Sequence, residues 1–404
     1  MISYPEAQAI VLKHCSPLGI ESRPLATARN FILAADIRTP FQLPRFDHSA
    51  VDGYAIRTDD VAAASTNNPI RLQVIDTVKT GYRAVTPVTQ GCAVRIFTGA
   101  MLPEGVDGVV MVEDVEFKDE FIQLTAPLKS NKNIRRTGEE FAEGEVCLRS
   151  GSRLTPPAIG LAATLGCRNV TVYRKPRIAV IVTGSELVDL GLPLGEAQIY
   201  DSNRIALTAA LCELGIDDVT AFTCPDDETS TRERIVSAFR DADIVITSGG
   251  ASVGDVDYVK PAITNLGGTI HFDKVAIKPG KPTVFAEVAG NPLFGLPGNP
   301  VSALVTYLLF VRPALLKIMG DIREPFETFL ATLSSAISKR SARTEFVRAR
   351  KSSSGDRTIV TPCSGQESHM MGGLAAADSL IVFEGEAGSL PAGSAVCAIS
   401  IGWS

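Results

Sequence analysis

An alternation of buried strands and capped helices between residues 177 and 320 constrains this chain more than any other feature. Continuous apolar stretches at 178–182, 243–247 and 293–296 predict strands that are buried on both faces, as in a parallel sheet. Helical patterns separate these strands, which is typical of an α/β domain. Each strand ends in a loop of glycine, proline or small polar residues, and ligands of open α/β sheets bind at the carboxyl ends of strands. These loops are therefore the predicted functional region.

Several helix starts are marked by side chains that accept hydrogen bonds from the first free backbone N–H groups. These positions are Ser3 with Glu6, Asp201 or Ser202, Ser230 with Glu233, and Asn299 followed by Pro300. A further helix is predicted after Pro156 and Pro157, running to Gly166. The chain is therefore expected to open with a helix and to carry long helices within its α/β part.

Short β-rich segments occupy the rest of the chain, so the predicted fold class is multidomain α/β plus β. A parallel α/β domain would carry an inserted all-β module and a small C-terminal β-barrel. The strands expected in the module are 70–78, 93–97 and 109–112, and those in the barrel are 329–336, 345–350, 358–360, 379–383 and 395–401. The predicted boundaries are 1–45 for an N-terminal helix and linker, 46–146 for the β module, 147–176 for a returning linker, 177–326 for the α/β domain and 327–404 for the barrel.

Composition excludes several classes of protein. Lys and Arg total 39 against 45 Asp and Glu, which argues against nucleic-acid binding because that requires an excess of cations. The eight cysteines are scattered, so neither a zinc knuckle nor CxxC redox chemistry is indicated. The longest apolar run, 301–311, is too short to span a membrane, and the N-terminus lacks a secretory signal. A cytoplasmic location with no membrane partner is expected.

The loop after the first strand combines small residues with a carboxylate: Thr183-Gly184-Ser185-Glu186. Backbone N–H groups in such a loop suit a phosphate. Glu186 would repel that phosphate unless a cation lay between them, so it indicates a metal ligand or a proton-transfer group. The plain alternative is a surface glutamate in a first helical turn. Asp226 supplies another carboxylate, unless it merely caps the following helix.

The loop at 248–258 combines three kinds of residue. Its glycines allow close approach of the backbone to a ligand, its serines can donate to phosphate oxygens, and its acids suit Mg²⁺, which prefers oxygen ligands. The glycines are Gly249, Gly250 and Gly254, the serines are Ser248 and Ser252, and the acids are Asp255 and Asp257. A purely structural turn would also explain the glycines.

Two further segments suit an anionic ligand. Residues 274–282 place Lys274, Lys278 and Lys281 between prolines and a glycine, a cationic arm that a net-acidic chain would need, although a solvated loop is the plain alternative. The loop at 295–300 has the small residues of a surface that a flat or phosphorylated ligand approaches closely. Its candidate binding residues are Pro297, Gly298 and Asn299. Together the four loops favour phosphoryl or nucleotidyl chemistry over redox chemistry.

A hydrolase must also be considered, because Gly250 to Gly254 matches a GxSxG nucleophile elbow with Ser252 at its centre. A catalytic triad needs a histidine, and only His271 and His369 lie downstream. Neither histidine belongs to a recognisable motif. The hydrolase interpretation is therefore disfavoured.

At these residues the chain resembles the molybdopterin molybdotransferases, the bacterial MoeA family that includes the E domain of gephyrin. The matching stretches follow one another in family order along nearly the whole chain. They are FDHSAVDGYA (46–55), IFTGA (96–100), RRTGEE (135–140), TGSEL (183–187), IYDSN (199–203), SGGASVGD (248–255), KPGKP (278–282) and GLPGNP (295–300).

The resemblance implies an elongated four-part subunit that forms a homodimer. The substrates would be adenylylated molybdopterin and molybdate, with Mg²⁺ as cofactor and AMP as leaving group. The active site would lie between the α/β domain of one subunit and the β module of its partner. Implied further partners are the molybdopterin adenylyltransferase and apo-molybdoenzymes.

The resemblance also implies roles for individual residues. Three acids would hold Mg²⁺ or position the attacking oxygen, three lysines would attract molybdate and phosphate, one aspartate would reach the site from the β module, and Thr98 would contact substrate. The acids are Glu186, Asp226 and Asp257, the lysines are Lys274, Lys278 and Lys281, and the aspartate is Asp52. An Asp-Gly turn is the plain alternative for Asp52.

Two departures from the family pattern and three alternatives remain. Glu140 stands where the family more often has Asp, which leaves it outside the predicted site, and Ala251 stands where Val is common. The alternatives to molybdate insertion are a non-catalytic scaffold and a molybdopterin adenylyltransferase, whose family lacks the β module and the barrel. Tungstate is an alternative to molybdate because the two oxyanions have nearly the same size and charge.

Overall fold

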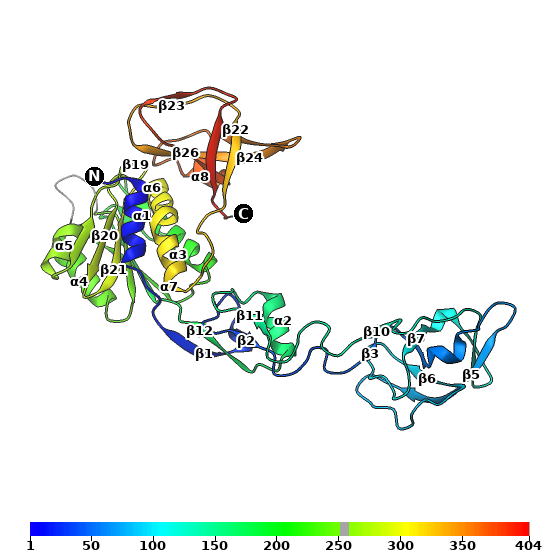
Figure 1. Ribbon diagram of the computed structural model, residues 1–404. Helices are drawn as coiled ribbons and strands as arrows, with labels where there is room; N and C mark the ends of the chain where they lie inside the picture. The colour runs from blue at the N-terminus through cyan, green and yellow to red at the C-terminus, as the bar shows by residue number, and fades with distance from the viewer. Residues whose placement is uncertain (251–257, 404) are drawn as a thin grey trace. The chain divides into compact units, whose positions relative to one another are not determined.

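The computed structural model describes residues 1–250 and 258–403. The chain forms two compact units. Unit 1 contains Met1–Ala35, Ser150–Ile159 and Arg168–Ser404, and unit 2 contains Asp36–Arg149 and Gly160–Cys167. The chain thus leaves unit 1, builds most of unit 2 and returns. Figure 1 labels the helices and strands along the chain.

A six-stranded sheet organises unit 1, and its strand order is β16-β13-β17-β21-β20-β18. The bounds are β13 Ile178–Thr183, β16 Val219–Cys224, β17 Ile244–Ser248, β18 Thr269–Phe272, β20 Val284–Val288 and β21 Asn291–Leu296. The three predicted strands, β13, β17 and β21, are confirmed as parallel neighbours. Their carboxyl ends therefore meet at one edge of the sheet.

The sheet carries two further strands on one side, which the sequence did not predict and which are antiparallel. Strand β20 runs antiparallel to β21, and β18 runs antiparallel to β20. The reason is local, because only Ala289 and Gly290 join β20 to β21 and both have positive φ, of 51° and 81°. A two-residue turn of this kind can connect only antiparallel strands. Apolar periodicity alone does not distinguish such a hairpin from parallel strands.

Helices cover both faces of the sheet, as Figure 1 shows. Alternate residues of β13 face opposite sides, with Val180 and Val182 in the core that contains α1, α3, α6 and α7, and Ala179 and Ile181 in the core that contains α4 and α5. The helices are α1 Tyr4–Lys13, α3 Ser202–Glu213, α4 Glu228–Ala238, α5 Val259–Asn265, α6 Pro300–Thr306 and α7 Arg312–Ile318. This two-layered cover explains why the strands are apolar throughout.

One continuous helical segment, Pro300–Ile318, runs from α6 through a π-helical turn at Tyr307–Val311 into α7. It is the one helix in the described parts of the chain that is long and apolar enough to cross a membrane, with mean hydropathy 1.6. However, 89% of it is buried inside the protein, as in the core helix of a folded domain. The Tyr307 hydroxyl donates to the Ala210 carbonyl of α3 at 2.9 Å and ties the two helices together.

The helix caps agree with the sequence at α1 and α3 but not at α4, nor at α6, where Asn299 is the N-cap residue but its side chain makes no cap hydrogen bond. The capping box of Ser3 and Glu6 is present, and Asp201 is the residue that caps α3. Helix α4 begins at Glu228 rather than near Ser230, because the side chain of Asp227 accepts the Ser230 backbone N–H at 2.8 Å. The Ser230–Glu233 pair is therefore not a capping box.

The predicted C-terminal barrel is confirmed, since five strands form a ring that β24 and β26 close by pairing with each other. The ring order is β24-β25-β22-β28-β26. The bounds are β22 Thr328–Leu333, β24 Thr344–Ser354, β25 Arg357–Pro362, β26 Ser379–Phe383 and β28 Ala395–Ser400. Outside the ring are β19 Ile277–Lys278, which pairs with β24, the ribbon of β23 Ile337–Lys339 and β27 Gly388–Leu390, and α8 Met371–Ala375.

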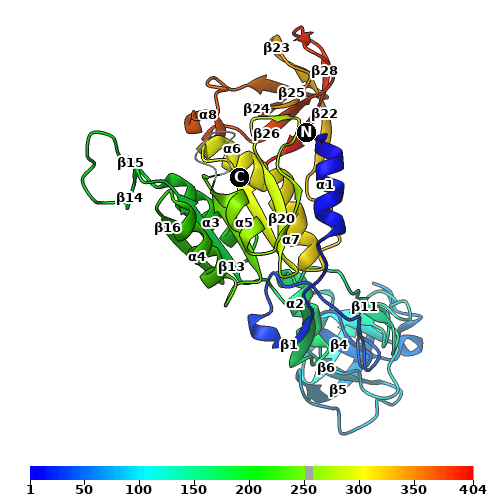
Figure 2. The same cartoon turned by 90° about the vertical axis from the view of Figure 1, so that its left-hand side faces the viewer.

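Shorter elements complete unit 1. Strand β1 pairs with β12, although more than a hundred residues of chain separate them. The short strands β14 and β15 pair at the base of a loop that projects beyond the sheet (Figure 2). The bounds are β1 Ile20–Pro24, η1 Leu25–Thr27, β12 Asn169–Tyr173, β14 Leu187–Val188 and β15 Ile199–Tyr200. The predicted helix after Pro156 is α2, Pro156–Thr164, which both units share.

Unit 2 is built on a six-stranded sheet with the order β7-β4-β6-β5-β9-β8. The strands expected from the sequence are present, and β5 coincides with its predicted range. The bounds are β4 Gly53–Ile56, η2 Thr58–Val61, β5 Ile70–Val78, β6 Cys92–Ile96, β7 Gly108–Met111, η3 Val112–Asp114, β8 Glu116–Lys118 and β9 Phe121–Leu124. Two smaller pairs are β2 Ile37–Arg38 with β11 Val146–Leu148, and β3 His48–Ser49 with β10 Ile134–Arg135.

Gly53 lets β4 and β7 pair closely, and its replacement tests this sheet. A Cβ atom at Gly53 would lie 2.0 Å from the Val110 carbonyl oxygen, so Gly53→Ala must push the two strands apart. We expect a loss of about 2–4 kcal/mol in the free energy of unfolding of unit 2, measured by urea unfolding with circular dichroism. Gly160→Ala is the control, since nothing lies within 4 Å of its Cβ and alanine favours the α2 helix. Equal stability of the two variants would contradict this account.

Asp243 anchors the start of β17 and gives a second prediction. Burial raises the pKa of Asp243, but hydrogen bonds from Arg174 and Arg177 outweigh it and lower the pKa from 3.8 to about 2. A lowered pKa in the folded state adds stability above pH 3.8, and this stability is lost as the pH falls through 2. Asp243→Asn should therefore cost about 1–2 kcal/mol at pH 7 and little near pH 2.

Fluorescence of Trp403, the sole tryptophan, can measure this effect because Trp403 lies in unit 1. Urea unfolding at pH 7, 4 and 2 gives the stability difference between the wild type and Asp243→Asn. The matched exchange Asp241→Asn, two residues earlier, should leave that difference near zero at each pH. A constant cost of Asp243→Asn at all three pH values would show that the ion pairs do not account for it.

Candidate functional site

A cavity of about 560 Å³ lies at the carboxyl ends of the parallel strands in unit 1. It is walled by the loops after β13, β16, β17 and β21 and by the start of α3. The lining residues are Val182, Thr183, Glu186, Leu187, Ile199, Tyr200, Asp201, Ser202, Asn203, Asp226, Ser248, Gly249, Gly250, Pro282, Pro297, Gly298, Asn299, Pro300 and His369. The cavity lies at the edge where the strands end, which is where the sequence analysis predicted the functional loops.

Two glycines let three loops meet backbone against backbone. Gly249 has a φ of 90°, and a Cβ atom there would lie 2.5 Å from the Thr183 carbonyl oxygen. A Cβ atom on Gly298 would lie 3.4 Å from the Gly249 Cα atom, and the Gly249 N–H donates to the Leu296 carbonyl at 3.2 Å. A side chain at Gly249 would therefore separate the loops that form the cavity floor.

Asn203, in the first turn of α3, connects two of these loops from inside. Its side-chain nitrogen donates to Ser248 Oγ at 2.9 Å and to the Gly298 carbonyl at 2.7 Å. Ser248 Oγ in turn donates to the Pro297 carbonyl at 3.1 Å. Asn203 belongs to the IYDSN stretch but was not among the predicted site residues. An amide two residues after a helix cap was the available signal.

Two buried oxygen atoms at the cavity have no hydrogen-bond partner among the described residues, Thr183 Oγ1 and Asp226 Oδ1. The Asp226 backbone N–H donates to Ser185 Oγ at 3.4 Å, which joins the loops after β13 and β16. Glu186 lines the same cavity, so the carboxylates of both Glu186 and Asp226 are available to a ligand there. A buried carboxylate oxygen without a donor is costly unless a ligand or cation meets it. This donor set suits a hard cation such as Mg²⁺.

The third predicted acid, Asp257, lies outside the described residues, as do Ser252, Gly254 and Asp255. Glu186 and Asp226 are therefore the predicted metal ligands whose positions are known. Asp201 also lines the cavity, but Arg204 Nε at 3.0 Å and Thr223 Oγ1 at 3.0 Å already satisfy its carboxylate. Its role in the described structure is to cap and orient α3.

The predicted lysines do not line the cavity, although Pro282 of the same segment does. Lys278 Nζ lies 3.3 Å from Glu345 Oε1 of the barrel, and the Lys274 carbonyl accepts from the Ile2 N–H at 3.3 Å. The Lys281 carbonyl accepts from Val275 N–H. Of the predicted loop residues, Gly184 and Ser185 likewise are not among the lining residues. The Gly184 N–H donates to the Cys224 carbonyl at 3.2 Å, and Ser185 Oγ accepts the Asp226 N–H.

His369, from the segment between β25 and α8, lines the cavity and was not predicted to do so. The neighbouring Ser368 binds the last loop, because Asn299 Nδ2 donates to Ser368 Oγ at 3.0 Å and Val301 N–H to its carbonyl at 3.2 Å. Asn299 thus holds this segment and makes no side-chain cap to α6. No sequence motif marks His369, so only the fold reveals it.

Asp52 and Thr98 lie together in unit 2. Asp52 Oδ1 accepts the Thr98 N–H at 2.7 Å and the Thr98 hydroxyl at 2.8 Å. These two hydrogen bonds and the charge of Arg95 lower the pKa of Asp52, so its carboxylate stays ionised at neutral pH. Thr98 therefore fixes the orientation of the Asp52 carboxylate, and the predicted site role of Asp52 stays a prediction beside the plain alternative of an Asp-Gly turn.

Comparison with known proteins identifies the family. Three family models match: the MoeA N-terminal region (domain I and II) at residues 2–166, a "probable molybdopterin binding domain" at 179–317, and the MoeA C-terminal region (domain IV) at 331–401. A molybdopterin molybdenumtransferase from Haemophilus influenzae is 37% identical over 98% of both chains, and one from Staphylococcus aureus is 37% identical over 92% of this chain and 89% of that one.

A solved structure supports the same assignment. The crystal structure of a molybdopterin biosynthesis MoeA protein from Pyrococcus horikoshii matches with a TM-score of 0.82 and 31% sequence identity, and the match covers 99% of this chain and 100% of that one. The closed C-terminal barrel, the mixed α/β sheet and the β-rich unit 2 all fall within this match. The chain therefore belongs to the MoeA family of molybdopterin molybdenumtransferases, which are transferase enzymes of molybdenum cofactor biosynthesis.

Proposed function

We propose that this chain inserts molybdate into adenylylated molybdopterin, with Mg²⁺-dependent release of AMP. The observation that carries this proposal is the cavity at the strand ends. There the carboxylates of Glu186 and Asp226 lie beside glycine-rich loops, and two buried oxygen atoms, Asp226 Oδ1 and Thr183 Oγ1, have no partner among the described residues. An anionic ligand with a phosphate needs the loop N–H groups, and the carboxylates beside it need a cation. The oxygen donor set of the cavity therefore fits a phosphoanhydride substrate with Mg²⁺.

Residues of the chain would divide the work between binding and orientation. Thr183, at the start of the loop after β13, and the loop at Ser248–Gly250 would bind the phosphates, and the loop at Pro297–Asn299 would contact the pterin. Glu186, Asp226 and Asp257 would hold Mg²⁺, which when bound neutralises phosphate charge and favours departure of AMP. An oxygen atom of water or molybdate would attack the phosphorus on the pterin side, the P–O bond to AMP would break, and AMP would leave with the bridging oxygen. The two thiol groups of the pterin would bind molybdenum, and their protons would leave with one molybdate oxygen as water.

The lysines and Asp52 would act from outside the described cavity. Lys274, Lys278 and Lys281 would supply local positive charge for molybdate and phosphate in a chain of net charge −6. Asp52, kept ionised by Thr98, would enter the site of a second subunit in a homodimer. Ser252 and Gly254 would complete the phosphate loop.

Exposed apolar residues support the homodimer. The segment that leads from β14 to the start of α3 carries large side chains that are between 41% and 57% exposed. They are Leu190, Leu192, Leu194, Ile199, Tyr200 and Ile205. Such a concentration is typical of a protein interface. A second copy would cover this surface, and the assembled enzyme would work in the cytoplasm with the adenylyltransferase before it and apo-molybdoenzymes after it.

Release of AMP from adenylylated molybdopterin tests the proposal directly. The purified chain is incubated with this substrate with and without Mg²⁺ and molybdate, and AMP and metal-loaded pterin are quantified. Release that requires both additions supports the proposal, and a parallel tungstate arm measures oxyanion preference. Tight binding without release would favour a scaffold. Formation of adenylylated molybdopterin from ATP would instead identify an adenylyltransferase.

Neighbouring aspartates allow a matched test of the carboxylate role. Asp226→Asn removes the charge of a carboxylate that lines the cavity, so AMP release should fall about 100-fold or more. Asp227→Asn makes the same exchange at the adjacent residue, where asparagine can still cap α4, so activity should change less than about twofold. Higher Mg²⁺ should partly restore Asp226→Asn. Equal activities of the two variants would remove Asp226 from the mechanism.

Asn203→Ala tests the internal support of the cavity. Loss of the amide leaves Ser248 Oγ and the Gly298 carbonyl without their donor, so the two ligand loops lose a common anchor. We expect the Kd for molybdopterin to rise about tenfold, measured by fluorescence titration. Asn265→Ala, at the exposed end of α5, is the matched control and should leave the Kd unchanged. An unaltered Kd in Asn203→Ala would show that the loops hold their positions without it.

A further inference from the structure

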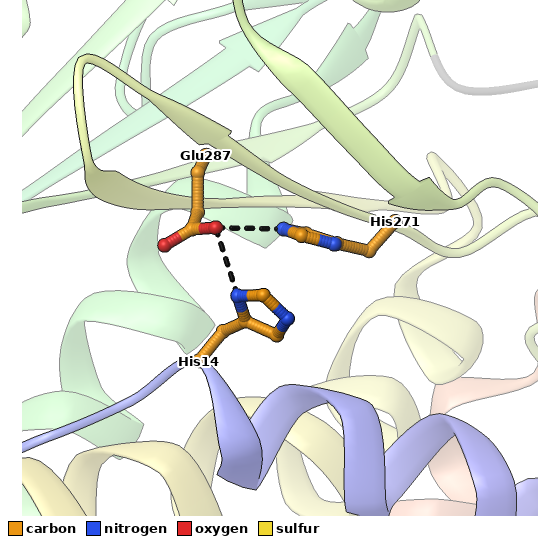
Figure 3. Close-up of side chains that lie close together, drawn as sticks. All are labelled: His14, His271 and Glu287. Atoms are coloured by element: carbon orange, nitrogen blue, oxygen red, sulfur yellow. Dashed lines mark hydrogen bonds and ion pairs between the residues drawn. The ribbon is translucent and has the colours of Figure 1, made fainter.

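A second group of polar side chains lies in unit 1, apart from the cavity, and Figure 3 shows it. It consists of His14, His271 and Glu287, none of which lines the cavity. His14 Nδ1 lies 2.9 Å from Glu287 Oε2, and His271 Nε2 lies 2.7 Å from the same oxygen. Among the described residues this is the one group of three His, Cys, Asp or Glu side chains whose ligand atoms lie within 4.8 Å of one another.

Three separate elements bring the group together. His14 is the C-cap residue of α1, His271 lies on β18, and Glu287 lies on β20. Strands β18 and β20 form the antiparallel side of the sheet, where Glu287 pairs with Thr269 and His271 lies at the irregularity between the paired residues Ile270 and Phe272. The buried Phe285 stacks on the His271 ring at 5.4 Å and meets the His14 ring edge-on at 6.4 Å. The three side chains are thus positioned before any ligand arrives.

The burial of the group suits an ion that must enter from water. The exposed fractions of the side chains are 28% for His14, 15% for His271 and 24% for Glu287, which leaves an open direction while the surrounding packing limits their movement. The two imidazole rings are only 3.9 Å apart between centroids. Two positive imidazoles at that distance would repel, whereas one shared cation would satisfy both rings and the carboxylate.

The chemistry of two imidazoles and one carboxylate favours Zn²⁺. Zinc takes histidine nitrogens and carboxylate oxygens at about 2.0–2.2 Å, so tetrahedral ligands lie roughly 3.3 Å from one another. The two N–O separations of 2.9 and 2.7 Å need to open by only about half an ångström. The single negative charge of the Glu287 carboxylate would balance one of the two positive charges of the zinc ion. Zinc with two histidines, one glutamate and a water in the fourth position is a known donor combination.

We propose that His14, His271 and Glu287 form a Zn²⁺ site that fastens the C-terminal end of α1 to the antiparallel strand pair β18–β20. Water would fill the fourth position. The role is structural, because the site joins an N-terminal helix to strands more than 250 residues later in the chain. The site does not depend on the proposed reaction at the cavity.

Zinc binding to the full chain tests the proposal after treatment with a chelator. Isothermal titration with Zn²⁺ should show a site of one equivalent, and each of His14→Gln, His271→Gln and Glu287→Gln should weaken its Kd at least tenfold. Co²⁺ provides a second probe, since tetrahedral nitrogen ligation gives visible absorption bands that the histidine variants should lose. Glu287→Gln is the least disruptive variant, because its amide oxygen still accepts a hydrogen bond. Hydrogen exchange of the α1 backbone should slow on zinc addition in the wild type and stay unchanged in Glu287→Gln.

Two control variants separate this site from other metal ligands. His48→Gln makes the same exchange in unit 2, and Asp226→Asn removes a carboxylate of the cavity. Both should bind the same equivalent of zinc as the wild type. Binding that survives in all three cluster variants, or that disappears in Asp226→Asn, would overturn the proposal. Tight zinc binding without any change in α1 exchange would also overturn it, since the ion would then not fasten the helix.

Discussion

The close approach of the Gly249 backbone to Thr183 on one side and Gly298 on the other is the constraint on which the site depends. Adjacent parallel strands bring their carboxyl ends within one loop width, but only residues without a Cβ atom let those loops touch. Asn203 then ties two of the loops with one amide. The floor is therefore made mostly of backbone, which leaves carboxylates and hydroxyls free to face the cavity.

The cavity and the histidine cluster both lie in unit 1, but they differ in the atoms that they offer to a ligand. At the cavity, oxygen atoms without partners face a space large enough for a substrate. At the cluster, nitrogen and oxygen atoms already contact one another, at 2.9 and 2.7 Å. Hard oxygen donors favour Mg²⁺, whereas imidazole nitrogens favour Zn²⁺, so the two proposed sites would select different metals by donor type.

The sequence predicts features that depend on local pattern and misses those that depend on topology. Buried strands, the cap at Asp201 and the glycine loops follow from apolar runs and short-range hydrogen bonding. The antiparallel β20 was missed because its turn is only two residues long and lacks a strong signal. His369 joins the cavity from a segment 69 residues after Pro300, a proximity that no local pattern encodes. The cap of α4 was predicted at Ser230 rather than at Asp227, because both residues are of types that cap helices.

The inserted position of unit 2 has a consequence for biosynthesis of the chain. Helix α1 is made before unit 2 and before most of unit 1, yet Gln8 binds the Leu309 carbonyl 301 residues later, and Val11 enters a core built largely from the second half of the chain. A ribosome would therefore complete unit 2 while the apolar face of α1 still lacks its binding surface. Contacts of such long range are slow to form and are exposed to aggregation. Chaperone demand during synthesis should accordingly fall on the first helix rather than on the inserted unit.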